Sequence, residues 1–184
     1  SQPPSFAELG VAAEICDGLA TRGITRTFAI QELTLPIALS GQDLIGQART
    51  GMGKTYGFGV PLLDRVFDDA DIEELDGTPR ALVVVPTREL AQQVTKDLQV
   101  AAADIPVRLV SIYGGRPYEE QITKLNKGAD VIIGTPGRLI DLHERGNLQL
   151  DRVAILVLDE ADEMLDLGFL PSVEAILQAL DGNA

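Results

Sequence analysis

The chain has 184 residues, of which 45% are hydrophobic, and it carries a formal net charge of -13. This length and apolar fraction fit one globular domain with an adequate core and exclude a disordered chain. With 28 acidic and 15 basic residues, the charge has the wrong sign for a protein that holds nucleic acid by bulk attraction, so any such binding must be local.

The cysteine content and the hydropathy indicate the compartment. The single cysteine, Cys16, falls in a predicted helix and has no partner for an internal disulfide, which indicates an intracellular protein with a buried, inert thiol. No apolar stretch approaches the ~20 residues of a membrane span, and residues 1–4 lack the basic-then-apolar order of a signal peptide. We therefore expect a cytoplasmic protein that makes no membrane contact.

Predicted strands and helices alternate along the chain. Residues 5–23 read as a lead-in followed by a helix that ends at Gly23, and residues 33–39 read as a helical stretch. Short β-branched apolar runs then predict five strands, at residues 43–47, 81–85, 107–112, 131–134 and 153–158. Helices are predicted from about Ala161 and over residues 171–180. The alternation favours an α/β domain whose mostly parallel central sheet has helices on both faces, with ligands beyond the carboxyl ends of the strands.

Two segments outside this alternation are distinctive. The acid-rich residues 68–76 lie between a predicted helix and a predicted strand, and we expect a solvated loop there. Residues 48–55 read Ala-Arg-Thr-Gly-Met-Gly-Lys-Thr and follow the first main strand.

The second of these segments has the composition of a phosphate-binding loop. Gly51 and Gly53 allow the backbone N–H groups to curl around a phosphate, and the next helix directs its positive end at the same anion. Lys54 can reach the β- and γ-phosphates, while the Thr55 hydroxyl is placed to bind Mg²⁺. The usual motif opens with Gly where this chain has Ala48. The alternative is a Gly-rich turn with a solvated lysine.

Two acids, Asp159 and Glu160, follow the last predicted strand. A carboxylate at that position can hold Mg²⁺ beside the phosphates, and a second can orient or deprotonate the attacking water. We assign Asp159 to the metal and Glu160 to the water. Alternatively, the two acids cap the helix that follows, because carboxylates favour helix N-termini.

Residues 159–162, Asp-Glu-Ala-Asp, spell the motif of the DEAD-box ATP-dependent RNA helicases, and the chain resembles the N-terminal RecA-like domain of that family. Ala is the normal first residue of the family's phosphate loop. Three further segments resemble the family's RNA-contacting motifs and occur in the expected order: residues 86–91, Gly114-Gly115 and residues 135–138. Residues 23–31, with Phe6 upstream, are similar to the adenine-recognising Q motif.

The resemblance implies a full set of site residues. ATP would be bound by Phe6, Ile24, Thr25, Gln31, Ala48, Thr50, Gly51, Gly53, Lys54 and Thr55. Mg²⁺ would be held by Thr55 and Asp159, and catalysis would use Lys54, Asp159 and Glu160. RNA would be bound by Pro86, Thr87, Arg88, Gly115, Arg116, Thr135, Gly137 and Arg138, and Asp162 would couple the motifs to the second domain.

The adenine contacts carry the preference for ATP over GTP. Phe6 would stack on the base, while Thr25 and Gln31 would hydrogen-bond its edge, where the two purines present different donors. The family usually has prolines where this chain has Thr27 and Ala29, so the loop is expected to be less rigid. The alternative for Phe6 is a hydrophobic staple at a helix entry.

The RNA motifs also make physical sense from their residue types. Arg88 and Arg138 each follow a Pro-containing turn at a strand end, where helix N-termini are available to phosphates. Gly115 permits close approach of a sugar-phosphate backbone, and Thr87 and Thr135 offer hydroxyls. Without an aromatic platform, the contacts are expected to be independent of base sequence. The alternative for Arg88 is an intrachain salt bridge.

The resemblance also implies parts that this sequence does not contain. The family has a Ser-Ala-Thr motif on a further strand and a second RecA-like domain that supplies arginine fingers. We expect residues 1–184 to be the N-terminal domain, with a Q-motif lead-in over 1–42 and a C-terminally incomplete core over 43–184. The missing strand would leave a gap between the phosphate-loop strand and the Asp-Glu strand. The expected partners are RNA and the second domain, and the isolated chain should bind ATP with little turnover.

Three other functions use the same loop. A DNA translocase or a GTPase could be built on it, but the guanine-reading Asn-Lys-x-Asp motif is not in the sequence. An ATP-dependent RNA clamp or scaffold, in which binding matters more than unwinding, stays open.

Overall fold

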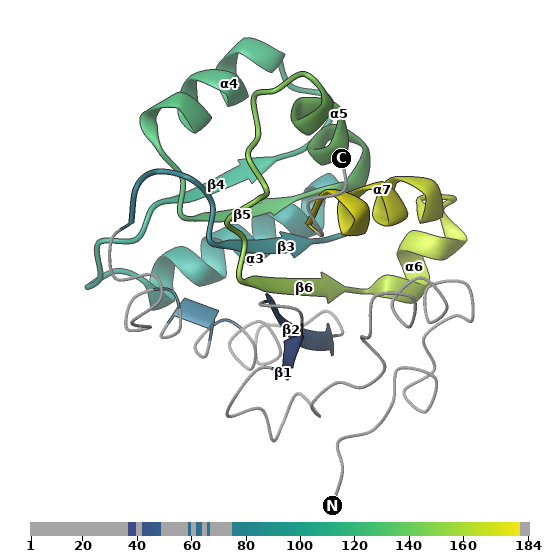
Figure 1. The fold of residues 1–184 in the computed structure, drawn as a ribbon, viewed down its shortest axis with the longest axis horizontal. Helices are drawn as coiled ribbons and strands as arrows, with labels where there is room; N and C mark the ends of the chain where they lie inside the picture. The colour runs from purple at the N-terminus through teal and green to yellow at the C-terminus, as the bar shows by residue number, and fades with distance from the viewer. Residues whose placement is uncertain are drawn as a thin grey trace, which may run out of the picture.

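The computed structural model describes residues 75–180, residues 59, 62, 63 and 66, and the backbone of two strands, β1 (Ile37–Leu39) and β2 (Gln42–Ala48). The other strands are β3 (Ala81–Val84), β4 (Leu109–Ile112), β5 (Val131–Gly134) and β6 (Ile155–Asp159). They form one sheet in the order β1-β2-β6-β3-β5-β4 (Figure 1). All neighbours pair in parallel except β1, which is antiparallel to β2. The predicted mostly parallel sheet is confirmed.

The strands at the centre of the sheet are buried on both faces. Every residue of β3, β5 and β6 is buried. Alternate residues serve two separate cores: Leu82 and Val84 of β3 face one, while Ala81 and Val83 face the other. This explains why these strands appear in the sequence as continuous apolar runs rather than as an alternating pattern.

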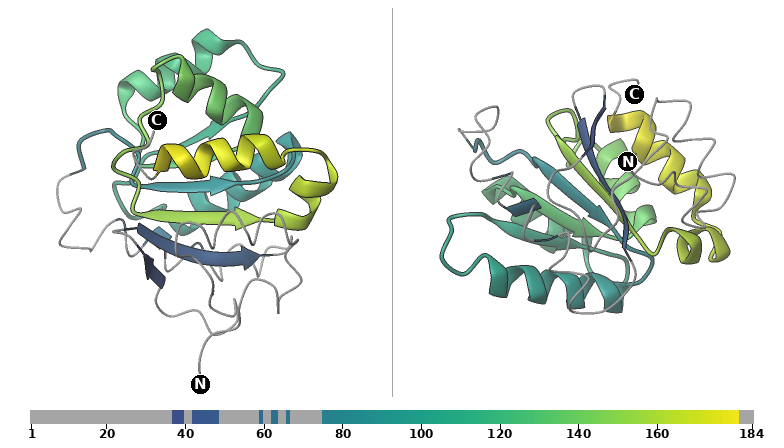
Figure 2. Two further views of the ribbon diagram at one scale, coloured as in Figure 1. Left: turned by 45° about the vertical axis from the view of Figure 1, so that its right-hand side comes forward. Right: turned by 90° about the horizontal axis from the view of Figure 1, so that it is seen from below.

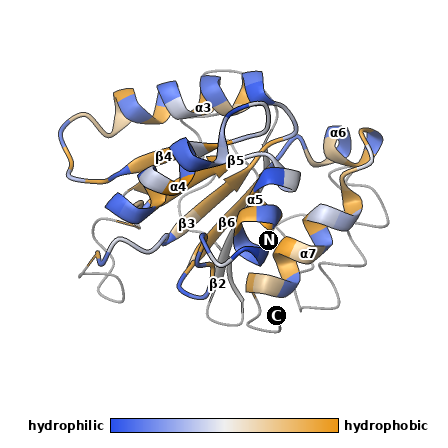
Figure 3. Cartoon of the chain, turned by 90° about the horizontal axis from the view of Figure 1, so that it is seen from above, coloured by the Kyte–Doolittle hydropathy of each residue, from blue (hydrophilic) through white to orange (hydrophobic). Residues whose placement is uncertain are grey.

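Helices cover both faces, as predicted. Helix α3 (Arg88–Ala101) packs on one face, and α4 (Tyr118–Lys127), α5 (Pro136–Glu144), α6 (Ala161–Asp166) and α7 (Leu170–Leu180) pack on the other. Figure 2 shows α3 and α7 on opposite sides of the sheet. In Figure 3 the strands are hydrophobic, whereas the outer surface of α3 is hydrophilic. The predicted helices at about Ala161 and at residues 171–180 are confirmed.

Two expectations about the N-terminal edge of the sheet are wrong. Residues 37–39, predicted to be helical, form strand β1, whose Leu39 lies opposite Gln42 of β2. Only Ser40 and Gly41 separate the two strands, a spacing and composition typical of a hairpin. The expected gap beside the phosphate-loop strand is also missing, because β2 pairs directly with β6. A gap would leave backbone polar groups of two inner strands without partners.

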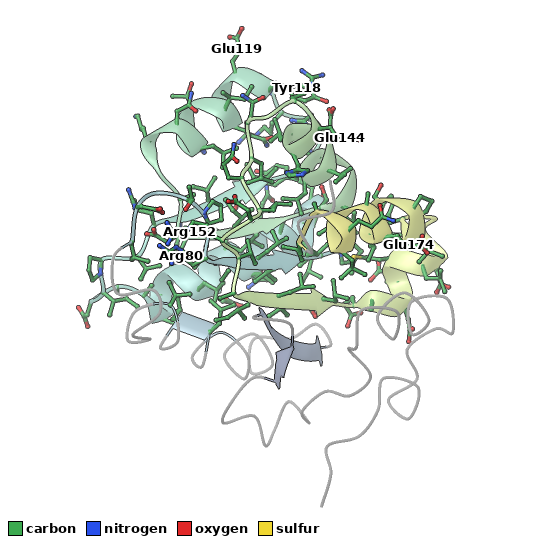
Figure 4. All side chains as sticks on the ribbon, viewed as in Figure 1. Arg80, Tyr118, Glu119, Glu144, Arg152 and Glu174 are labelled. Carbon is green, nitrogen blue, oxygen red and sulfur yellow. The ribbon has the colours of Figure 1, made fainter. Side chains whose placement is uncertain are left out.

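The acid-rich segment 68–76 falls within the described residues only at its end. There Asp76 is exposed, as expected, but it also forms ion pairs with Arg80 and Arg152. The two arginines lie close together in Figure 4. Hydrogen bonds from Thr78, supported by both arginines, lower the pKa of Asp76 to about 2. This cluster therefore joins the segments that precede β3 and β6, at the amino end of the sheet.

Among the helices that the structure describes, none has the length and apolar character that a membrane crossing requires.

Candidate functional site

The carboxyl edge of the sheet brings the sequence-predicted motifs together in two groups. Strands β2 and β6 are neighbours, and their last residues, Ala48 and Asp159, are paired in register. Strands β3, β5 and β4 are also neighbours, and Val84, Gly134 and Ile112 are aligned at their ends. Ala48 and Asp159 therefore lie at one half of the edge, and the predicted RNA residues follow the strands of the other half (Figure 1).

The two acids after β6 differ in backbone conformation. Asp159 is the last residue of the strand and is 1% exposed. Glu160 has φ 58° and ψ 50°, and among the described residues it alone has a positive φ without being glycine. For an L-residue this left-handed conformation costs roughly 1–2 kcal/mol. Such strain persists where the surrounding structure imposes it, and it is concentrated at functional sites.

Helix capping does not explain Glu160. The residue occupies the N-cap position of α6, but its side chain makes no capping hydrogen bond to the helix. Asp162 lies in the first turn of α6, where a carboxylate favours the positive end of the helix. The Glu160 side chain therefore does not cap the helix, which was the alternative role considered for it.

One of the two predicted metal ligands lies in the described part of the chain. Asp159 fits a cation site in its chemistry, because a carboxylate buried at a strand end is stabilised when a cation neutralises it. Its register partner, Ala48, is the first residue of the predicted phosphate loop, so Asp159 lies opposite the residue at which that loop begins. No group of three or more metal-ligating side chains occurs in the segments that the structure describes.

The other predicted nucleotide residues lie outside the described residues. They are Phe6, Ile24, Thr25, Gln31, Thr50, Gly51, Gly53, Lys54 and Thr55. Their assigned roles stay predictions.

In the RNA half, β3 leads through buried Pro86 to the N-terminus of α3. Thr87 is the N-cap, and its Oγ1 accepts a hydrogen bond from the Leu90 N–H at 3.1 Å. Because a hydroxyl can accept and donate at once, the Thr87 proton is still available to a phosphate oxygen. The expected contact of Thr87 with an RNA phosphate is therefore compatible with the helix cap, with the hydroxyl as the donor.

Arg88 follows at the surface. The intrachain salt bridge considered for it exists, because Nε lies 3.5 Å from a carboxylate oxygen of Glu89. The two side chains are 52% and 75% exposed, and exposed pairs contribute only about 0–1 kcal/mol, so this pair does not hold Arg88 away from a ligand. A Cβ added to Gly115 would lie 3.1 Å from Arg88 Nη1. The guanidinium therefore extends from the N-terminus of α3 towards the segment that follows β4.

That segment, residues 114–116, is open to solvent. Gly115 has φ +83°, which requires glycine-like freedom, and nothing lies within 4 Å of a Cβ built on Gly114. Arg116 is exposed and hydrogen-bonds the hydroxyl of Tyr113, which raises the pKa of Arg116. A hydrogen bond from Gln92 is the main cause that lowers the pKa of Tyr113.

The third predicted RNA segment begins α5. Thr135 is the N-cap without a side-chain capping bond, and Pro136 occupies the first turn. Gly137 is exposed, with open space where a Cβ would stand. The first turn of α5 thus presents backbone and a small residue to solvent, which suits a phosphate contact.

Arg138 makes its observed contacts within the chain. Its Nη1 donates to the Arg116 carbonyl and to Gln121 Oε1, both at 2.9 Å. The guanidinium also lies over the Tyr118 ring, 3.9 Å from the centroid. The predicted contact of Arg138 with RNA stays a prediction, but these bonds show that the side chain ties the end of β4 to α5.

The residues packed around Arg138 do not stand out in the sequence. The ring of Tyr118, which is labelled in Figure 4, contacts two guanidinium groups, because Arg145 also lies over it, 4.0 Å from the centroid. The Tyr118 hydroxyl donates to Asp141, and this bond is the main cause that lowers the pKa of Asp141. These residues belong to none of the motifs recognised in the sequence.

Comparisons with known proteins identify the family of the chain. The family model "DEAD/DEAH box helicase" matches residues 28–184. The chain is 46% identical over 177 residues to DEAD-box ATP-dependent RNA helicase 53 of Oryza sativa subsp. japonica, which covers 96% of this chain and 29% of that protein. It is also 46% identical over 173 residues to DEAD-box ATP-dependent RNA helicase CshA of Geobacillus kaustophilus, covering 94% of this chain and 36% of that protein.

Solved structures show the same fold. The yeast DEAD-box splicing factor Prp28 superposes with a TM-score of 0.67 and 33% identity, covering all of this chain and 44% of that one. A hypothetical ATP-dependent RNA helicase from Sulfolobus tokodaii gives a TM-score of 0.66 and 33% identity, with 92% and 47% coverage. The fold is RecA-like, and the chain spans less than half of each protein that it matches here.

Proposed function

This chain belongs to the DEAD/DEAH box helicase family, and from that premise we propose that it is the ATP-binding domain of an RNA helicase and forms part of its RNA-binding surface. The observation that carries the proposal is the division of the sheet edge. Ala48 and Asp159 end two paired strands, while Val84, Gly134 and Ile112 end the three strands beside them. Nucleotide and RNA would therefore bind to adjacent parts of one rigid sheet.

In the nucleotide half, each proposed role follows from position and chemistry. Asp159 and Thr55 would hold Mg²⁺, which when bound neutralises charge on the phosphates. Lys54 would contact the β- and γ-phosphates. Glu160 would orient the attacking water and accept its proton. Its left-handed backbone sets the direction in which the side chain leaves the chain.

In the RNA half, the proposed ligand is the sugar-phosphate backbone. The N-termini of α3 and α5 offer N–H groups, Gly115 and Gly137 permit close approach, and Arg88 adds an exposed positive charge. Of the aromatic rings here, Tyr113 is buried and the ring of Tyr118 is in contact with the guanidinium groups of Arg138 and Arg145. This supports contacts that do not depend on base sequence.

The complete protein would couple ATP binding and hydrolysis to local unwinding of RNA duplexes or remodelling of RNA-protein complexes. A second RecA-like domain would close on the nucleotide and supply arginine fingers, which are worth about 10³–10⁵ in rate in related phosphoryl transfer. The second candidate, an ATP-dependent RNA clamp, needs the same residues but not turnover.

The test is ATP hydrolysis with and without RNA. We expect RNA to stimulate the ATPase of the complete two-domain protein, whereas the isolated 184-residue chain hydrolyses ATP at least about a thousandfold more slowly because the fingers are missing. The measurement is steady-state phosphate release at saturating ATP, with GTP as the control nucleotide. RNA-stimulated hydrolysis by the isolated chain at the rate of the complete protein would contradict the proposal.

A further inference from the structure

Two separate backbone segments form much of the proposed RNA surface, and one buried side chain joins them. The segments are residues 114–116, after β4, and the first turn of α5. Gln121 of α4 is only 3% exposed. Its Nε2 donates to the Tyr113 carbonyl at 2.9 Å, and its Oε1 accepts from Arg138 Nη1 at 2.9 Å.

The chemistry of the partners fixes how the Gln121 amide is oriented. A backbone carbonyl can only accept a hydrogen bond, and a guanidinium can only donate. The amide must therefore direct its nitrogen at Tyr113 and its oxygen at Arg138. Both ends of the amide are used within the chain, one on Tyr113, directly before residues 114–116, and one on Arg138 in the first turn of α5.

Arg138 completes the connection. The same Nη1 that bonds Gln121 also donates to the Arg116 carbonyl at 2.9 Å. Arg116 is the last residue of the first segment, and Arg138 lies in α5, immediately after exposed Gly137. Gln121 and Arg138 thus hold the end of β4 and the start of α5 at one spacing.

We infer that Gln121 is a positioning residue for RNA binding: through Arg138 it sets the distance between the two segments that grip the RNA backbone. The inference rests on the proposed function. It follows from charge as well as geometry, because a chain with net charge -13 cannot compensate for misplaced contacts by bulk attraction. Two weak contacts on one strand reinforce each other only when their spacing matches the ligand, and a preformed spacing lowers the cost of binding.

Two substitutions separate the bonds that Gln121 makes. Gln121→Met keeps the approximate volume and removes both hydrogen bonds. Gln121→Glu keeps an acceptor for Arg138 but cannot donate to the Tyr113 carbonyl. Gln149→Met is the matched control, because Gln149 is exposed and bonds only the nearby Gly146 carbonyl.

The measurement is the affinity of the complete protein for a short fluorescein-labelled oligouridine, followed by anisotropy with saturating ATP analogue. We expect Gln121→Met to weaken RNA binding about tenfold, Gln121→Glu about threefold, and Gln149→Met not at all. The dissociation constant for ADP should stay within about twofold in every variant. A purely structural role would instead lower the thermal midpoint and leave RNA affinity unchanged, and that result would overturn the inference.

A double-mutant cycle tests whether the effect passes through Arg138. In an Arg138→Ala background, Gln121→Met should weaken RNA binding by less than about twofold further, because the connection is already broken. A second tenfold loss would overturn the inference while leaving the proposed function intact. A wild-type protein that bound no RNA would overturn both.

Discussion

We expect Glu160→Gln to lower kcat for ATP hydrolysis by the complete protein about 10²–10⁴-fold, the range typical of a lost general base. The carboxamide has nearly the same size but cannot accept the proton of the attacking water. The affinity for ATP should change little, because Glu160 is assigned to the water and not to the nucleotide. Single-turnover hydrolysis and equilibrium binding of ATP separate the two quantities.

The fold should tolerate this substitution. The Glu160 side chain makes no cap for α6, and the left-handed backbone is imposed equally on Gln. An unchanged thermal midpoint is therefore the control. An enzyme that kept full kcat would show that Glu160 is not the base.

The same variant distinguishes the two candidate functions. An ATP-dependent clamp keeps its cellular role when hydrolysis is blocked, because binding is sufficient. A helicase that must release RNA after each cycle loses its role. Complementation of a strain depleted of the protein with the Glu160→Gln variant would reveal which applies.

The second large effect is expected at Gly134, where β5 ends between β4 and α5. A Cβ at this position would lie 2.5 Å from the Ile112 carbonyl oxygen and 2.8 Å from Leu139 Cδ2. The Ile112 carbonyl also accepts the bond from the Thr135 N–H at 3.0 Å, which holds the two strand ends together. Gly134→Val should lower the free energy of unfolding by about 2–3 kcal/mol, because the clash is partly with backbone. Denaturant unfolding of the chain measures it.

Gly137→Val provides a matched control three residues later. Nothing lies within 4 Å of a Cβ at Gly137, and valine is intrinsically no worse than glycine in a helix. Its unfolding free energy should therefore stay within about 0.5 kcal/mol of the wild type. Equal losses in the two variants would show that the close approach at Gly134 is not the cause. Valine favours strands, so propensity cannot explain a loss at Gly134.

Much of the fold could be predicted because apolar runs and strand ends are local properties of the sequence. The strand at residues 131–134 was predicted with its observed bounds, since both ends change abruptly in polarity. The strand predicted at 107–112 begins only at Leu109, because the Arg108 N–H instead bonds the buried Asp130 carboxylate at 2.8 Å. A run of apolar residues does not reveal such a long-range partner.

The errors had the same origin. The stretch at residues 33–39, predicted to be helical, is too short for its pattern to decide between helix and strand, and pairing with β2 made residues 37–39 a strand. The order of the strands is likewise a property of the whole sheet, so the direct pairing of β2 with β6 could not be read from either segment. The gap was expected because the family has a further strand, with the Ser-Ala-Thr motif, between the strands that correspond to β2 and β6.

The site residues that belong to sequence motifs could be predicted, whereas those brought together only by packing could not. Asp159 and Glu160 stand out because two acids follow a buried apolar run. Gln121 and Tyr118 do not stand out, because glutamine and tyrosine are ordinary residues of a surface helix until the fold places Arg138 against them. The left-handed backbone of Glu160 was also invisible, since non-glycine residues rarely adopt it.

The central claim is that this chain binds an adenine nucleotide, and calorimetric titration with Mg²⁺-ADP and, in parallel, Mg²⁺-GDP tests it most directly. We predict saturable binding of ADP by the 184-residue chain and none of GDP, as expected if Phe6, Thr25 and Gln31 read the adenine edge. Equal binding of both nucleotides would contradict the adenine assignment, and binding of neither would contradict the account of the nucleotide half of the sheet edge.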